Sequence, residues 1–170
     1  MRHALFIIAP ENFRDEELFV PREILEKNGI VTTIASTEAG VCHGKLGGEV
    51  EAAIGLNQIN VEDFDAIIFV GGAGAQIFWH NPAALLIAQK AVAHDKVLAA
   101  ICAAPTILAL AEVLQGKKAT VFSDENYEKI LTDHGALLSK NEIEVDGKII
   151  TANGPAAAAE FGNKIVALLR

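Results

Sequence analysis

The sequence predicts an α/β fold in which helices cover both faces of a mostly parallel sheet, and three observations support this class. Short apolar runs alternate with helical patterns almost from end to end. The runs are apolar at consecutive positions, which is typical of central parallel strands buried on both faces. No internal repeat, linker or low-complexity tract interrupts the alternation. A doubly wound sandwich with right-handed crossovers is therefore expected, as one domain over residues 1–170.

Each expected element has its own signal. Central strands are expected at residues 3–9, 31–35, 66–70, 97–100 and 149–151. Helices are expected near residues 15–28, 82–94, 104–114, 124–134 and 155–169. Asn28-Gly29 and Gln115-Gly116 are helix stops, and Asn81-Pro82 is an N-cap followed by proline at the first helical position. Residues 44–53 and the segment 141–147 predict short hairpin strands at the periphery.

Composition and charge restrict the classes of function. The hydrophobic fraction of 51% is too high for a disordered chain. A net charge of −8 and the lack of a basic run argue against binding to nucleic acid or to an anionic membrane surface. The uncharged stretch 97–111 contains Pro105 and is shorter than the ~20 residues of a membrane span. With two cysteines and no apolar signal-peptide core at the start, a reduced, cytoplasmic setting is expected.

Cys102, within the stretch VLAAICAAPT, is the candidate nucleophile. It lies where a predicted strand turns into a predicted helix, and such an elbow needs small residues two positions before and after the nucleophile. Ala100 and Ala104 meet this requirement. The N-terminus of the helix is expected to favour the thiolate and so to lower the pKa of Cys102. The pattern alone leaves open the alternative that Cys102 is a buried, inert cysteine.

The run Gly71-Gly72-Ala73-Gly74 follows the neighbouring predicted strand. It matches neither the dinucleotide-binding nor the phosphate-loop pattern, so no cofactor is expected. The backbone N–H groups of Gly72 and Ala103 are instead candidates for a two-donor oxyanion hole. A glycine-rich turn without any ligand explains these glycines nearly as well.

Glu17 is the candidate proton carrier. Pro21 clashes with the carbonyl group of Glu17, so a regular helix is not expected to run through this turn, and Glu17 is expected to face inward. A buried glutamate beside a thiol would have a raised pKa and could hold or share a proton. Asp15 and Glu16 are expected to form a solvated first turn of the helix. The alternative that Glu17 belongs to this solvated turn stays open. None of the five histidines has metal-ligand spacing, so no metal is expected.

Taken together, Glu17 four residues before a proline, Gly71-Gly72 after a strand and the run Ala-Ile-Cys102-Ala-Ala-Pro resemble the ThiJ/PfpI family. This family is a branch of the class I glutamine amidotransferase-like superfamily, and the resemblance covers nearly the whole chain. It implies a flavodoxin-like three-layer sandwich and a homodimer. It also implies a nucleophilic Cys102 that shares a proton with Glu17 and oxidises easily to sulfinic acid, with Gly72 and Ala103 as oxyanion donors.

Two departures from the family pattern affect the functional prediction. Protease-like members have a histidine directly after the cysteine, where this chain has Ala103. Deglycase-like members supply a histidine from the turn after the next strand, where Phe122 or a neighbour stands here. The leading hypothesis is a stress-response enzyme, glyoxalase III-like or protein deglycase-like, that acts on a small reactive carbonyl or a glycated substrate. A redox-sensing or chaperone-like protein without turnover is the alternative, and a PfpI-like cysteine peptidase would need a histidine from elsewhere.

Overall fold

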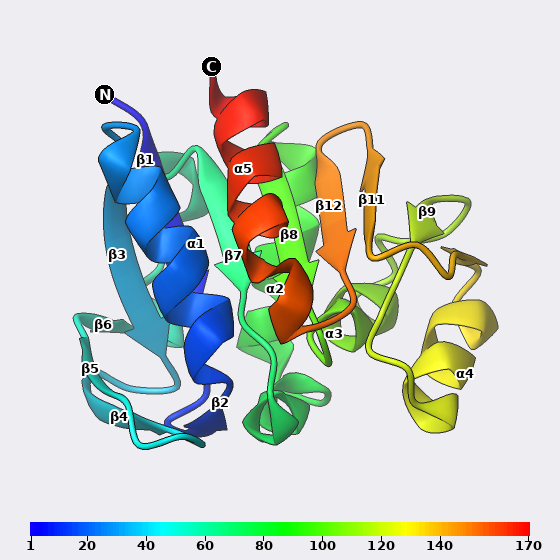
Figure 1. Cartoon of the computed structure of the whole chain (residues 1–170), viewed down its shortest axis with the longest axis horizontal. Coiled ribbons are helices and arrows are strands. Elements are labelled where there is room, and N and C mark those ends of the chain that lie inside the picture. The colour runs from blue at the N-terminus through cyan, green and yellow to red at the C-terminus, as the bar shows by residue number, and fades with distance from the viewer.

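Seven strands form the central sheet of the computed structural model, which describes residues 1–170 (Figure 1). Their order across the sheet is β11-β12-β8-β7-β1-β3-β6, and every neighbouring pair is parallel except β11 and β12. The strands are β1 (His3–Ile7), β3 (Val31–Ser36), β6 (Ile54–Gly55), β7 (Ala66–Phe69), β8 (Val97–Ile101), β11 (Ile143–Asp146) and β12 (Ile149–Ala152). The predicted α/β class with a mostly parallel sheet is confirmed.

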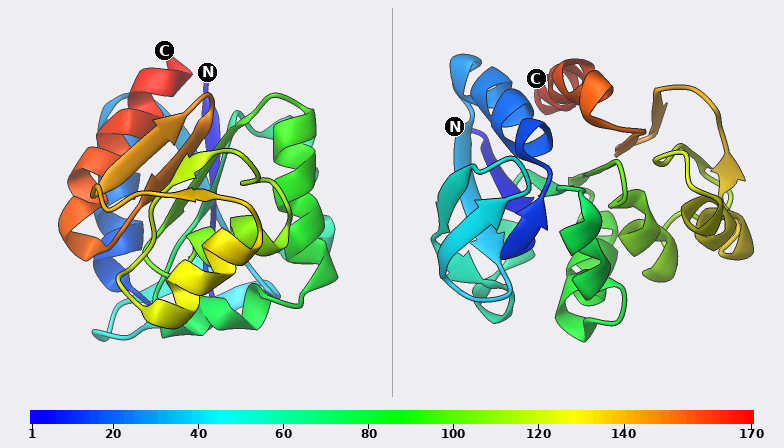
Figure 2. Two further views of the ribbon diagram at one scale, coloured as in Figure 1. Left: turned by 90° about the vertical axis from the view of Figure 1, so that its right-hand side faces the viewer. Right: turned by 60° about the horizontal axis from the view of Figure 1, so that its bottom comes forward.

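Helices cover both faces of this sheet, which gives three layers (Figure 2, left). One face is covered by α1 (Asp15–Lys27) and α5 (Ala158–Leu169), which pack against each other. The other face is covered by α2 (Pro82–Ala93) and α3 (Pro105–Leu110), and α4 (Glu125–Asp133) packs on α3. All five predicted helices are present, although α3 ends at Leu110, earlier than expected.

The core lies in two layers because side chains alternate along each central strand. In β1, Leu5 and Ile7 face one buried cluster, while Ala4 and Phe6 face the other. All four side chains are fully buried, which explains why the strands are apolar at consecutive positions.

The peripheral strands differ in part from the prediction. A hairpin forms as expected, but its arms are β4 (Gly40–Gly44) and β5 (Glu49–Ala52), and a short strand β2 (Glu11–Phe13) adds a third strand beside β4. The segment 141–147 contributes β11, which pairs with β12 at the edge of the central sheet. The two-residue strands β9 (Lys118–Ala119) and β10 (Leu137–Leu138) form a separate pair that the sequence analysis did not predict.

The expectation that Pro21 interrupts the helix is wrong, because α1 continues through it. Pro21 removes one N–H donor, but its ring lies at the contact between α1 and α5. A Cβ atom at Gly162 of α5 would lie 3.0 Å from the Cα atom of Pro21. The close approach that glycine permits at this point gives the two helices a packed contact in place of the missing hydrogen bond.

None of the helices has both the length and the apolar character that a bilayer span requires.

Candidate active site

The candidate residues meet at the carboxyl ends of the central strands, the lower edge of the sheet in Figure 1. The chain places β3 on one side of β1 and β7 with β8 on the other, so the strand order switches at β1 and β7. Ligands of doubly wound sheets bind at such a switch. Figure 2, right, in which this edge comes forward, shows β2 and the β4–β5 hairpin on one side of it and α4 on the other.

Cys102 lies directly after β8 with a φ angle of +65°. This left-handed conformation is uncommon for a residue with a side chain and costs on the order of 1–3 kcal/mol. Backbone hydrogen bonds hold the residue on both sides: its N–H donates to Ala152 (2.8 Å), and its carbonyl accepts from Phe122 (2.8 Å). The elbow therefore presents the Cys102 side chain from a fixed, strained backbone.

The Cys102 side chain lines a cavity of about 210 Å³. Residues from six separate segments of the chain form its wall. The lining residues are Arg14, Lys45, Gly72, Ala73, Cys102, Ala103, Phe122, Asp124, Tyr127 and Pro155.

Glu17 lies behind Cys102, fully buried in the first turns of α1. A Cβ atom built on Gly71 would lie 2.7 Å from both the Oε1 atom of Glu17 and the Cβ atom of Cys102, so the two side chains meet at this glycine. Neither carboxyl oxygen of Glu17 has a well-aligned hydrogen-bond partner in the chain. Burial raises the pKa of Glu17 to about 7, against an opposing effect of Cys102. The sequence analysis correctly placed Glu17 inward, although for a different reason, because α1 is continuous.

The pKa of the Cys102 thiol is raised to about 12, first by burial and then by the negative charge of Glu17. The backbone N–H groups of Gly72 and Ala103 act in the opposite direction. The expected lowering of the thiol pKa by a helix N-terminus is therefore wrong. Helix α3 has only six residues, and the desolvation of the thiol in a residue that is 8% exposed outweighs its effect.

Gly71 and Gly72 are required by close packing beside the elbow. Gly72 has a φ angle of +95°, and a Cβ atom there would lie 2.6 Å from both the backbone N atom of Arg14 and the backbone O atom of Asn12. Close packing alone therefore explains why these two positions are glycines. This explanation does not conflict with the position of the Gly72 N–H group beside the sulfur of Cys102.

Asp15 was expected to be solvated, and this expectation is wrong. It is buried, and its carboxylate accepts hydrogen bonds from the backbone N–H groups of Leu46 (2.8 Å) and Gly48 (2.7 Å) in the turn of the β4–β5 hairpin. Asp15 thus ties the hairpin turn to the start of α1. Glu16 does face solvent in part and pairs with Arg14 at 3.0 Å.

No histidine lines the cavity, in line with the departure from the family pattern at Ala103 and Phe122. His80 is exposed, and His43 contacts Glu11 and Glu49 on the β2–β4–β5 sheet. No cluster of three or more His, Cys, Asp or Glu side chains is placed to hold a metal ion.

Sequence reasoning missed a polar link that supports the elbow. The indole N–H of Trp79 donates to the Thr106 hydroxyl (2.7 Å), which donates in turn to the carbonyl of Ala103 (2.5 Å). It also missed Arg14 and Lys45 in the cavity wall. Lys45 is far from Cys102 along the chain, and no sequence signal places it there.

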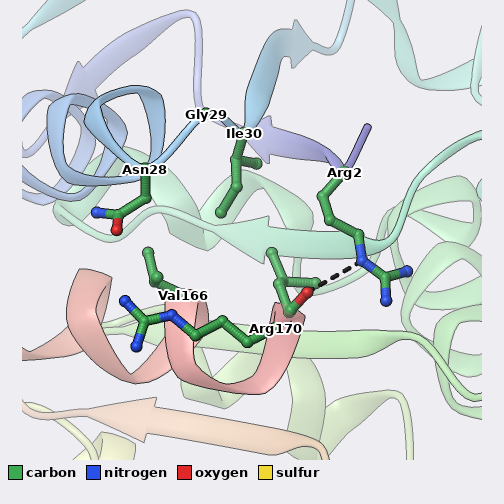
Figure 3. A pocket seen from close by; sticks show the side chains of 7 residues that line it. Arg2, Asn28, Gly29, Ile30, Val166 and Arg170 are labelled. Atoms are coloured by element: carbon green, nitrogen blue, oxygen red, sulfur yellow. Dashed lines mark hydrogen bonds between the residues drawn. The ribbon is translucent and has the colours of Figure 1, made fainter.

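A second hollow, of about 110 Å³, lies at the opposite end of the sheet (Figure 3). There the Nε atom of Arg2 donates to the carbonyl of Leu169 at 3.0 Å. Val166, Asn28, Gly29 and Arg170 also line it, and it contains no nucleophile.

Fold and site together define an α/β sandwich with a cysteine on a strand-to-helix elbow and a buried glutamate beside it. The chain belongs to the DJ-1/PfpI family, which it matches over residues 2–168. It is 33% identical to deglycase PfpI of Pyrococcus furiosus, over 98% of each chain. It is 26% identical to the glutathione-independent glyoxalase DJR-1.2 of Caenorhabditis elegans, over 99% of this chain and 89% of that one. The crystal structure of a ThiJ/PfpI domain protein from Brachyspira murdochii superposes with a TM-score of 0.93 at 30% identity, covering 98% of this chain and 95% of that one.

Proposed function

We propose that this protein is a cysteine-dependent enzyme that acts on small reactive carbonyl compounds, with Cys102 as nucleophile and Glu17 as proton carrier. The observation that supports it most is the fully buried carboxyl of Glu17, which has no well-aligned partner and lies against a cavity-lining thiol on a strained elbow. Unpartnered buried polar groups are rare and call for an explanation, and a catalytic role is one. The deglycase and glyoxalase names of the relatives agree with this chemistry.

The pKa values favour a general-base mechanism over a resting thiolate. With a thiol pKa raised to about 12, Cys102 is protonated at neutral pH, whereas Glu17 with a pKa of about 7 is partly ionised. The carboxylate accepts the thiol proton as the sulfur attacks, so no thiolate need exist before the substrate arrives. A passive redox sensor depends on a resting thiolate, which is why we favour turnover over the redox-sensing alternative.

The proposed reaction with a 2-oxoaldehyde begins at the aldehyde carbon, C1. The sulfur of Cys102 bonds to C1, its proton passes through Glu17 to the former aldehyde oxygen, and a hemithioacetal forms. The N–H groups of Gly72 and Ala103 stabilise the transient oxyanion. Glu17 then removes the hydrogen from C1 and returns it to C2, while the hydroxyl proton on C1 moves to the oxygen on C2. Water hydrolyses the resulting thioester, which releases a 2-hydroxy acid and the free thiol.

The position of Glu17 behind the sulfur suits these reaction steps. Glu17 does not line the cavity. C1 becomes bonded directly to the sulfur, however, and so is brought beside the carboxyl. Peptide hydrolysis has no comparable support, because no histidine lines the cavity to protonate a leaving amine.

The test is the conversion of methylglyoxal to lactate by the purified protein, followed by NMR. Cys102→Ala should abolish lactate formation, while the matched change Cys42→Ala should preserve it, because Cys42 is buried in the β4–β5 hairpin and lies outside the cavity. Lactate formation no faster than in buffer, or equal rates in the two variants, would refute the proposal. A homodimer and a cytoplasmic location stay predictions from the family resemblance and the sequence.

A further inference from the structure

The charge of the cavity wall points to the kind of substrate. Two cationic side chains, Arg14 and Lys45, line the cavity, and the only anionic one is Asp124. An oxygen of Asp124 already accepts the N–H groups of Asn126 (2.9 Å) and Tyr127 (3.1 Å) at the start of α4. Cationic residues therefore outnumber anionic ones in the cavity lining of a chain whose net charge is −8, and Glu16, which pairs with Arg14 at 3.0 Å, does not belong to this lining.

The guanidinium of Arg14 has one edge free. Its Nε and Nη2 atoms donate to the carboxylate of Glu16 at 3.0–3.2 Å, whereas its Nη1 atom makes no hydrogen bond within the chain. The backbone N–H of Arg14 donates to the carbonyl of Gly71 (3.0 Å), which fixes the residue beside the elbow. Its charge is close enough to interact with both Glu17 and Cys102.

Lys45 approaches the same cavity from the turn of the β4–β5 hairpin. The turn is fixed on two sides: the backbone N–H of Lys45 donates to Phe13 (2.9 Å), and the buried carboxylate of Asp15 holds the next residues of the turn. Lys45 is one of the residues that line the cavity, and its ammonium makes no ion pair or hydrogen bond within the chain. Two like charges held at one small cavity favour an anion between them.

We propose that the substrate is a 2-oxoaldehyde that carries a carboxylate, with its aldehyde at Cys102 and its carboxylate bound by Arg14 and Lys45. This inference rests on the proposed function and names the substrate class. The volume of about 210 Å³ lies below the roughly 300–1,000 Å³ of drug-sized sites, so the substrate is a short molecule. The free guanidinium edge provides charge-assisted hydrogen bonds for a carboxylate, and an aldehyde without a carboxylate has no acceptor at this position.

A matched pair of substrates tests whether the enzyme prefers a substrate that carries a carboxylate. The probe 4,5-dioxopentanoate would yield 2-hydroxyglutarate, and 2-oxopentanal has the same carbon chain without the carboxylate. The wild type should convert the carboxylated probe with a kcat/KM at least about tenfold higher, which is the effect of one charge-assisted hydrogen bond. Arg14→Gln and Lys45→Gln should each reduce this preference, mainly through KM, and Arg14→Lys should keep part of it. Arg22→Gln is the control, because Arg22 pairs with Glu26 (2.9 Å) on α1 and does not line the cavity. Its preference should equal that of the wild type.

A binding measurement separates failure of this inference from failure of the proposed function. The ketone 4-oxopentanoate, which lacks the aldehyde, should slow alkylation of Cys102 by iodoacetamide in the wild type and not in Arg14→Gln, and uncharged 2-pentanone should not slow it. Turnover of both aldehydes without preference, together with no protection by 4-oxopentanoate, would overturn the inference and leave the proposed function standing. Protection that depends on Arg14, without turnover of either aldehyde, would support the anion site and refute the proposed function.

Discussion

The buried carboxyl of Glu17 should make the stability of the fold fall as pH rises. Its pKa is raised from 4.5 to about 7 by burial, so the folded protein binds a proton that the unfolded chain has already released between these values. The sign follows from proton linkage. The free energy of unfolding falls from about pH 4.5 upward, and this fall levels off above about pH 7. Each pKa unit corresponds to about 1.4 kcal/mol, so the full loss is about 3 kcal/mol.

Replacing Glu17 with Gln should remove this dependence, because the amide has nearly the same shape and does not titrate. The free energy of unfolding in urea should be measured for both proteins between pH 5 and pH 8. The stability of Glu17→Gln relative to the wild type should increase by about 2.5 kcal/mol over this range. Taking the difference between the two proteins cancels the contributions of all groups that are the same in both.

Glu23→Gln on the same helix is the control. Glu23 is exposed, and its hydrogen bond with Lys27 lowers its pKa, so it stays ionised throughout this range. Its difference from the wild type should be constant between pH 5 and pH 8. A constant difference for Glu17→Gln as well would refute the raised pKa and the proton-carrying role built on it.

Three further predictions follow from the same contacts. Iodoacetamide followed by peptide mapping should label Cys102 (8% exposed) in preference to Cys42 (1% exposed), and preferential labelling of Cys42 would contradict the site assignment. Gly72→Ala should lower the free energy of unfolding by at least roughly 1–3 kcal/mol, because its φ is +95° and a Cβ atom would overlap the backbone of Arg14; an unchanged urea midpoint would contradict this packing. Asp15→Ala should leave two backbone N–H groups of the hairpin turn unpaired and speed hydrogen exchange at residues 45–48, whereas unchanged exchange would show that Asp15 does not hold the turn.

The fold was predictable from the sequence because its signals are local and agree with one another. The consecutive apolar positions of β1, β7 and β8 reflect burial on two faces, and the N-cap Asn81 accepts the N–H groups of Ala83 (3.0 Å) and Ala84 (3.2 Å) as expected. The short strands β2, β9 and β10 were not predictable, because pairing with distant segments forms them and two or three residues hold no periodicity.

The candidate site was predictable only where the motif itself fixes the geometry. The small neighbours of Cys102 allow its left-handed conformation, and this could be inferred from the sequence. The pKa of the thiol could not, because it depends on burial and on the charge of Glu17 across the fold. The burial of Asp15 and the place of Lys45 in the cavity wall could not be predicted for a similar reason, because both depend on tertiary contacts of the hairpin turn.

The most direct test of the Cys102–Glu17 pair is the conversion of methylglyoxal in deuterated water. The thiol proton exchanges with solvent, but the hydrogen that Glu17 takes from C1 is held by a fully buried carboxyl until it is returned to C2. Lactate from the wild type should therefore keep protium at C2 in a substantial share of molecules, as seen by NMR. Lactate that carries deuterium at C2 throughout would contradict proton transfer by Glu17, and lactate formed equally well by Cys102→Ala would contradict the account of the site altogether.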